Sequence, residues 1–297
     1  MPDDFDPNGP DGPMALLDRL VEALRGDAPT GPPQLQLHPE VEGTMPPIPP
    51  PLPFEIRSLP SPNHYRGRAG VEADVLLLHY TAGKGNALAT ARVFASPTRE
   101  ASAHFTVGRG HGDVVQCVDL DDAAWSAGDG GKARLPSSAQ LLATDADAGV
   151  PVFVPIGLVP PAPKLNNRRA VAIEICNRGF APGGANPRVS ARHRNPACGS
   201  TSWEAYDDEQ IDTLVALARH IVAAVPTLRW VAAHEDCTHA DTLGDVFGTV
   251  EIERKSGGKV DVGPAFPWDR MPLGELHLQR VAYDFKRHGW RIEADPG

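Results

Sequence analysis

The stretch VLLLHY at residues 75–80 decides the fold of this chain. Its run of apolar residues predicts a strand buried on both faces, which we place over Ala73 to Tyr80. A second apolar run, Leu228 to Ala233, is also followed by a histidine and predicts a strand over Trp230 to His234. Each strand therefore carries a histidine near its carboxyl end, where a rigid scaffold can aim a side chain at a fixed point.

The segments around these strands alternate between strand and helix patterns. Asp207 is placed to cap the longest predicted helix, and Pro226 follows the end of that helix. The expected elements are helices over Asn86–Ala95 and Asp207–Val225, a hairpin of Ala103–Val107 and Val114–Val118, and a strand over Ala170–Cys176. This order indicates an α/β domain with a mixed central β-sheet flanked by helices.

The rest of the chain divides into loops and an N-terminal region. Segments 129–168 and 181–204 are rich in Gly, Pro, Ser and Asn and are predicted to be long surface loops that wall a groove. Residues 1–54 hold an acidic leader, a short helix over Met14 to Arg25 and a proline-rich linker. Residues 55–297 are predicted to form the globular domain with a C-terminal extension.

The composition argues against two classes of protein. The net charge is -10 and the basic residues are scattered, whereas a nucleic-acid binder needs clustered Lys and Arg for phosphate contacts. No window reaches about 18 uninterrupted apolar residues, so no membrane span is expected. The acidic N-terminus also lacks the basic and apolar regions of a signal peptide. We expect a monomer with neither nucleic acid nor membrane as a partner.

The four cysteines give no metal-binding pattern. Cys117, Cys176, Cys198 and Cys237 are unevenly spaced and form no C-x-x-C pair, which argues against a cysteine zinc site. Buried free thiols are the default interpretation. A disulfide between Cys198 and Cys237 is the alternative.

Three residues far apart in the chain have the character of zinc ligands: His79, His234 and Asp261. Two imidazoles and one carboxylate leave a fourth zinc position open, which is the pattern of a catalytic rather than a structural site. A single histidine at a strand end is more often structural. The zinc interpretation therefore depends on the three residues together and on the motifs around them.

Two further charged residues fit such a site. Glu174 lies inside the apolar run AVAIEIC and needs a partner there. It is either paired with an arginine such as Arg169 or a general base whose pKa is raised by burial. Lys259 lies two residues before Asp261 and points the same way in an extended segment. It either stabilises a negative oxygen in a tetrahedral intermediate or is a solvated loop residue.

These motifs resemble the zinc-dependent N-acetylmuramoyl-L-alanine amidases of type 2, the family that includes phage amidases and peptidoglycan recognition proteins. The resemblance covers roughly residues 57 to 271. The matching motifs, in chain order, are SPN, LLLHYTAG with His79, ASAHFTV, GRGHGDVVQCV, AAWSAG, AVAIEICNRG with Glu174, WVAAHED with His234, and KVDVGPAFPW with Lys259 and Asp261.

The resemblance implies a function and a role for each matched residue. It implies hydrolysis of the amide between N-acetylmuramic acid and L-alanine, in peptidoglycan or in muropeptides. His79, His234 and Asp261 would bind Zn2+, Glu174 would activate water, and Lys259 would stabilise the oxyanion. His104, Phe105 and Trp125 would bind substrate by lining or supporting the site.

The chain departs from the family pattern at two motifs. It has Ser126 after Trp125 where the family often has histidine, and Val262 where the family has proline. Two other functions stay open: a peptidoglycan receptor without turnover, and a zinc hydrolase of another amide. The protein is expected in the cytoplasm, or at the cell wall after release by lysis or delivery by a secretion machine.

Overall fold

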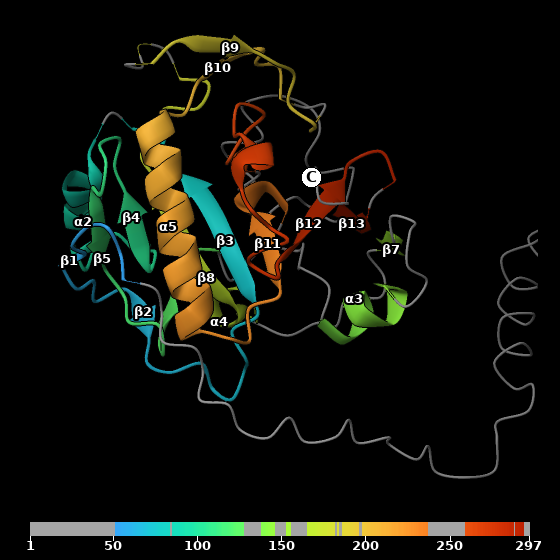
Figure 1. The fold of residues 1–297 in the computed structure, drawn as a ribbon, viewed down its shortest axis with the longest axis horizontal. Helices are drawn as coiled ribbons and strands as arrows, with labels where there is room; N and C mark the ends of the chain where they lie inside the picture. The colour runs from blue at the N-terminus through green and yellow to red at the C-terminus, as the bar shows by residue number, and fades with distance from the viewer. Residues whose placement is uncertain are drawn as a thin grey trace, which may run out of the picture. The chain divides into compact units, whose positions relative to one another are not determined.

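The run at 75–80 forms a central strand of a large sheet in the computed structural model (Figure 1). The structure describes residues 51–83, 85–127, 138–145, 153–155, 165–181, 183, 186–195, 198–236, 259–287 and 289–293. All of them belong to one unit, residues 46–297. The predicted helix at 14–25 and Cys237, the second half of the predicted disulfide, lie outside the described residues, so both stay predictions.

The described elements follow the predicted order with small shifts at their ends. The strands are β1 (Arg57–Ser58), β2 (His64–Tyr65), β3 (Val75–Tyr80), β4 (Phe105–Val107), β5 (Val114–Gln116), β6 (Ala123–Ala124), β7 (Phe153–Pro155), β8 (Ala170–Ile175), β9 (Arg188–Ser190), β10 (Ser202–Glu204), β11 (Trp230–Ala233), β12 (Gln279–Asp284) and β13 (Gly289–Glu293). The helices are α2 (Ala87–Phe94), α3 (Ser138–Asp145), α4 (Leu165–Arg169), α5 (Asp208–Ala224) and the 3-10 turns η2 (His234–Asp236) and η3 (Trp268–Arg270).

Nine of the described strands form one mixed sheet, which confirms the predicted sheet type. Their order is β1-β5-β4-β8-β3-β11-β12-β13-β7. The neighbours β4, β8, β3, β11 and β12 run parallel, and antiparallel pairs lie toward both edges. Because the middle strands are parallel, their carboxyl ends meet at one edge of the sheet.

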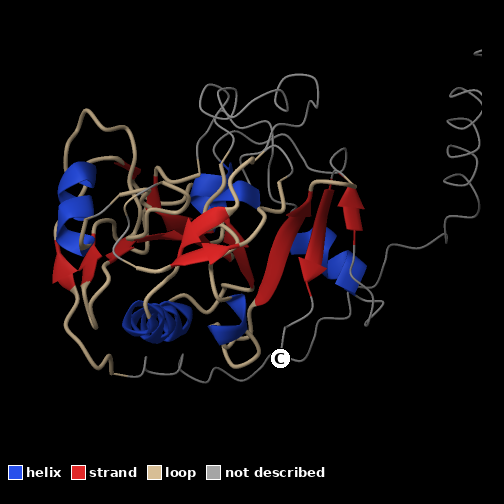
Figure 2. Ribbon diagram, turned by 90° about the horizontal axis from the view of Figure 1, so that it is seen from above, coloured by secondary structure: helices blue, strands red, loops and turns tan. Residues whose placement is uncertain are grey.

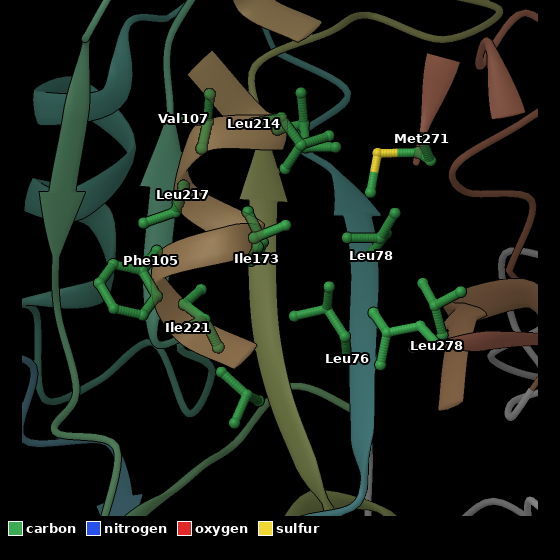
Figure 3. Close-up of a cluster of buried hydrophobic side chains, with 14 of the residues drawn as sticks. Leu76, Leu78, Phe105, Val107, Ile173, Leu214, Leu217, Ile221, Met271 and Leu278 are labelled. Carbon is green, nitrogen blue, oxygen red and sulfur yellow. The ribbon is translucent and has the colours of Figure 1, made fainter. Parts of the chain in front are cut away.

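Alternation along β3 sends its side chains to two hydrophobic cores. Helices lie on both sides of the sheet (Figure 2). Leu76 and Leu78 face the core that α5 covers, where Leu214 and Ile221 point toward the sheet (Figure 3). Leu77 packs in the opposite core with residues of α2 and α3. Because neighbouring strand residues face opposite sides, one apolar run supplies both layers, as the predicted two-sided burial requires.

The helix caps differ from each other. Asn86 caps α2 because its side-chain oxygen accepts a hydrogen bond from the backbone N–H of Ala89 at 2.8 Å. Asp207 occupies the N-cap position of α5, as predicted, but its side chain makes no capping hydrogen bond. The acidic first turn of α5, with Asp208 and Glu209, still favours the positive end of the helix dipole.

The prediction of two long loops is wrong in part. Segment 129–168 contains α3, β7 and most of α4, and segment 181–204 contains the hairpin of β9 and β10. These elements are short, and two of them depend on distant partners: β7 pairs with β13, and Ser138 of α3 donates a hydrogen bond to Asp74. Tertiary contacts fix them, so local composition indicated only loops.

The C-terminal extension adds strands to the sheet. β12 joins β11 in parallel, and β13 then links β12 to β7. None of the helices that the structure describes combines the length and apolar character needed to cross a membrane.

Candidate active site

Two neighbouring parallel strands bring the predicted histidines together. Leu78 of β3 is opposite Ala233 of β11, so the next residue of each strand, His79 and His234, lies at the same edge of the sheet. The two Nδ1 atoms are 2.8 Å apart, and both side chains are buried. The apolar runs that precede the histidines therefore fix both imidazoles as rigid extensions of the sheet.

Asp261 reaches the histidines from a segment without regular secondary structure. Its Oδ2 lies 3.1 Å from Nδ1 of His234 and 3.4 Å from Nδ1 of His79. Two hydrogen bonds hold the segment in place: the backbone N–H of Glu235 donates to the carbonyl of Asp261 at 2.9 Å, and the Tyr206 hydroxyl donates to the carbonyl of Val262 at 2.8 Å. Tertiary contacts therefore aim the carboxylate.

Gly263, two residues after Asp261, shows how tightly the segment around Asp261 packs. Gly263 has a φ of +79°, and an added Cβ would lie 2.9 Å from the ring of Trp203. Only glycine combines that backbone conformation with so close an approach. The turn beside Asp261 is therefore shaped without the proline that the family has at position 262.

The three ligand atoms fit a zinc ion. Tetrahedral ligands about 2.0–2.2 Å from zinc lie roughly 3.3 Å from one another, and the distances between these three atoms are 2.8, 3.1 and 3.4 Å. Burial alone would raise the pKa of the Asp261 carboxyl, but His234 and His79 hold it well below its usual range. Burial and the neighbouring His234 lower the pKa of His79. A carboxylate and a neutral imidazole are the protonation states that bind metal.

Glu174 lies on β8, directly opposite His79 in the parallel register. Burial raises the pKa of its carboxyl to about 7, although the nearby charges of His79 and Lys259 lower it. The alternative interpretation, an ion pair with Arg169, is wrong: Arg169 binds Asp74 instead, with Nε 2.8 Å from Oδ1 and Nη2 2.9 Å from Oδ2. Glu174 thus has the pKa of a general base.

One cavity of about 660 Å³, called here the site cavity, joins the five residues that were predicted to bind metal or to act in catalysis. Its lining includes His79, Glu174, His234, Lys259 and Asp261. The candidate metal ligands and the two charged residues predicted to act in catalysis therefore line one space large enough for a small ligand.

Trp125 also lines the site cavity, and its ring packs against Tyr65 with centroids 5.4 Å apart. Further lining residues were not predicted from the sequence, among them Val93 at the end of α2, Arg99 after that helix, and Phe180. Phe180 follows the Glu174 strand by only a few residues, and that proximity was the one available signal.

His104 does not line the site cavity, which corrects its predicted contact with substrate. It is fully buried, and the backbone N–H of Ala172 donates to its Nδ1 at 3.0 Å. The ring proton therefore lies on Nε2, which donates to the carbonyl of Asp122 at 3.1 Å. Burial and nearby Arg68 lower the pKa of His104 to about 3. The neutral His104 ring therefore links Ala172 to Asp122 through hydrogen bonds and supports the fold.

Phe105 is displaced from the site cavity in a similar way. It is 2% exposed and packs in the core beneath α5, beside Ile173 and Leu217 (Figure 3). The predicted substrate contact is therefore wrong for Phe105 as well. Both residues stand next to each other at the start of β4, where hydrogen bonds and packing hold the strand against β8.

The chain belongs to the N-acetylmuramoyl-L-alanine amidase family, whose family model matches residues 69–244, more than half of the sequence. It is an enzyme that hydrolyses the amide bond between N-acetylmuramic acid and L-alanine, in peptidoglycan or in muropeptides. The match includes His79, Glu174 and His234. It ends before Lys259 and Asp261, which the structure brings to the same cavity.

Solved structures of amidases show weak overall similarity. A selenomethionine derivative of AmpD is 19% identical, with a TM-score of 0.41, 75% of this chain covered and 94% of that chain. AmiD from E. coli, in complex with the substrate anhydro-N-acetylmuramic acid-L-Ala-D-gamma-Glu-L-Lys, is 20% identical, with a TM-score of 0.39 and coverage of 69% and 57%.

A mutant endolysin from Bacillus subtilis is also similar. It is 19% identical, with a TM-score of 0.34, and the similarity covers 61% of this chain and 84% of that chain. A search of curated protein sequences gives no match. Family membership therefore rests on the sequence match.

Proposed function

We propose that this amidase works with one zinc ion held by His79, His234 and Asp261. The observation that carries the proposal is the convergence of two imidazole nitrogens and one carboxylate oxygen within 3.4 Å of one another. When bound, zinc lowers the pKa of water and polarises a carbonyl. The complete ligand set supports an enzyme over a receptor without turnover.

Glu174 is proposed as the general base. Its carboxylate takes a proton from the attacking water, and the resulting carboxylic acid gives that proton to the leaving amine of L-alanine. A pKa raised to about 7 suits both steps because the group gains and loses a proton near neutral pH.

Lys259 is proposed to stabilise the negative oxygen that develops on the scissile carbonyl. It lines the same cavity as Glu174 and acts on the Glu174 carboxyl through its charge. An ammonium aimed into a partly enclosed site stabilises charge more than one in water. Lys259 would therefore act chiefly in the transition state.

The proposed substrate is a muropeptide of the kind bound to AmiD, a muramic acid that carries a short acidic peptide. The net charge of -10 gives the protein no attraction to anionic wall polymers, so recognition must come from contacts in the cavity.

We further propose a monomer whose catalytic domain spans residues 55–297. It would act in the cytoplasm, or at the wall after lysis or secretion.

Mass spectrometry of reaction products tests this function. Zinc-loaded protein is incubated with intact sacculi and, separately, with soluble muropeptides. Free peptides that begin with L-alanine, together with muramic acid bearing a free lactyl carboxylate, are expected. The preferred substrate separates wall lysis from muropeptide turnover. Release of neither product while zinc is bound would refute the proposal and favour another amide or a receptor role.

A further inference from the structure

A second cavity, of about 770 Å³, lies close to the site cavity, because His193 in its lining pairs with Glu235, the residue after His234. We call it the basic cavity, because its lining includes Arg192, Arg194, Lys286 and Arg291 with Asp284 as its one acidic residue among those described. It is enclosed by the segment between β9 and β10 and by the ends of β12 and β13. Part of the lining of the basic cavity, including Lys286 and Arg291, lies beyond the residues that the family model matches.

Aromatic rings form the wall between the two cavities. Phe180 lines the site cavity and packs edge-on against Trp203, with centroids 5.7 Å apart. His193 lines the basic cavity and stacks on the same Trp203, with centroids 5.4 Å apart. A row of three aromatic side chains, Phe180, Trp203 and His193, therefore lies between the two spaces.

The η2 turn connects the same two spaces. His234 lines the site cavity, and the next residue, Glu235, pairs with His193 of the basic cavity. Nε of Arg194 lies 2.6 Å from Oε1 of Glu235, and Arg194 also pairs with Asp236. These ion pairs anchor the inner wall of the basic cavity to the strand end that carries a proposed metal ligand.

The charges of the basic cavity are only partly balanced. Arg194 is neutralised by its two acidic partners, and Arg291 pairs with Glu293 at 2.8 Å. Arg192 and Lys286, by contrast, are exposed and make no ion pair with any described residue. They project from different elements, so two uncompensated cations flank one cavity in a protein whose net charge is -10.

We propose that the basic cavity binds the carboxylates of the substrate's peptide, an inference that rests on the proposed function. A γ-linked glutamate keeps a free carboxylate, and the peptide's end supplies another. An extended peptide of three or four residues spans roughly 10–14 Å, which is comparable with the length of the row of rings from Phe180 through Trp203 to His193. Guanidinium and ammonium groups are the natural partners of carboxylates, and Arg192 can offer two parallel donors to one of them.

A binding experiment tests this without turnover. The peptide L-Ala-D-γ-Glu-L-Lys, with free carboxylates, is titrated calorimetrically into the full chain after chelation of metal, and compared with the same peptide amidated at both carboxyls. The R192Q/K286Q variant should bind the free peptide about five- to twentyfold more weakly. Added salt should weaken binding to the unaltered chain, since exposed charges are screened.

A matched control removes two positive charges elsewhere. Arg219 and Arg229 are exposed and line neither cavity, so R219Q/R229Q should keep the affinity of the unaltered chain. Equal affinity of R192Q/K286Q and the unaltered chain, or equally tight binding of the amidated peptide, would overturn the inference.

Kinetics then separate this inference from the proposed function. R192Q/K286Q should raise KM for the acidic muropeptide and leave kcat unchanged, since the cavity contributes binding remote from the reacting bond. Turnover with an unaltered KM would overturn the inference alone. Charge-dependent peptide binding without hydrolysis by the zinc-loaded chain would refute the proposed function alone.

Discussion

The site cavity and the basic cavity share a wall but are built in different ways. The site cavity takes its reactive side chains mainly from the ends of neighbouring parallel strands, where His79, Glu174 and His234 follow from register. The basic cavity lies between the segment that joins β9 to β10 and the strands β12 and β13 near the C-terminus. The difference indicates that the sheet positions the residues proposed for catalysis, while the segments around the sheet bind the peptide part of the substrate.

The largest expected effect comes from Asp261→Ala, which removes one of the three proposed ligands. Zinc retention should be lost, and activity should fall on the order of 10³-fold or more, because metal stabilises charge in the transition state by several kcal/mol. Metal analysis and assay of the same sample check this. Asp269→Ala on η3 provides the control, since that residue lines neither cavity. Full activity of Asp261→Ala would contradict the ligand assignment.

Glu174→Gln should give the next largest effect. The amide cannot accept the proton, so kcat should fall by about 10²–10⁴-fold, while zinc content and KM stay close to those of the unaltered chain. Circular dichroism establishes that the variant is folded. Unchanged kcat would assign proton transfer to another group and leave Glu174 as a supporting residue on β8.

Lys259→Ala should reduce kcat by about 10²-fold, in line with the loss of one oxyanion partner. Lys259→Arg keeps the charge and should recover part of that loss. A change confined to KM would show that Lys259 binds the ground state and not the transition state.

His104→Ala tests whether His104 supports the fold or contacts substrate. It should reduce the free energy of unfolding by about 2–4 kcal/mol, because buried hydrogen-bond partners on Ala172 and Asp122 lose their mate. Well below the melting temperature, KM should stay unchanged. A raised KM with unchanged stability in denaturant unfolding would restore the substrate contact that the sequence predicted.

The sequence predicted most of the site because its signal is local. An apolar run next to a histidine identifies a strand end, and a carboxylate inside such a run identifies Glu174 as unusual. Parallel pairing of β3 with β8 and β11 then places these residues side by side. Asp261 was also predicted as a ligand, but its position depends on backbone contacts with distant segments that no local pattern encodes.

The rest of the fold could not be predicted because its elements depend on distant partners. β7 has three residues and pairs with a strand more than a hundred residues away in the sequence. The roles of His104 and Phe105 were misassigned for a related reason: a motif identifies residues near a site but not the direction of their side chains. The His104 side chain, just before β4, joins a hydrogen-bond network, and the Phe105 side chain, at the start of β4, joins a hydrophobic core.

We propose that one metal ion at the edge of β3 and β11 drives amide hydrolysis. Chelated protein is titrated with zinc while hydrolysis of a soluble muropeptide is followed. We expect no activity without zinc and a linear rise of activity that saturates at one zinc per chain. Full activity in thoroughly chelated protein, or saturation only at two zinc ions per chain, would contradict it.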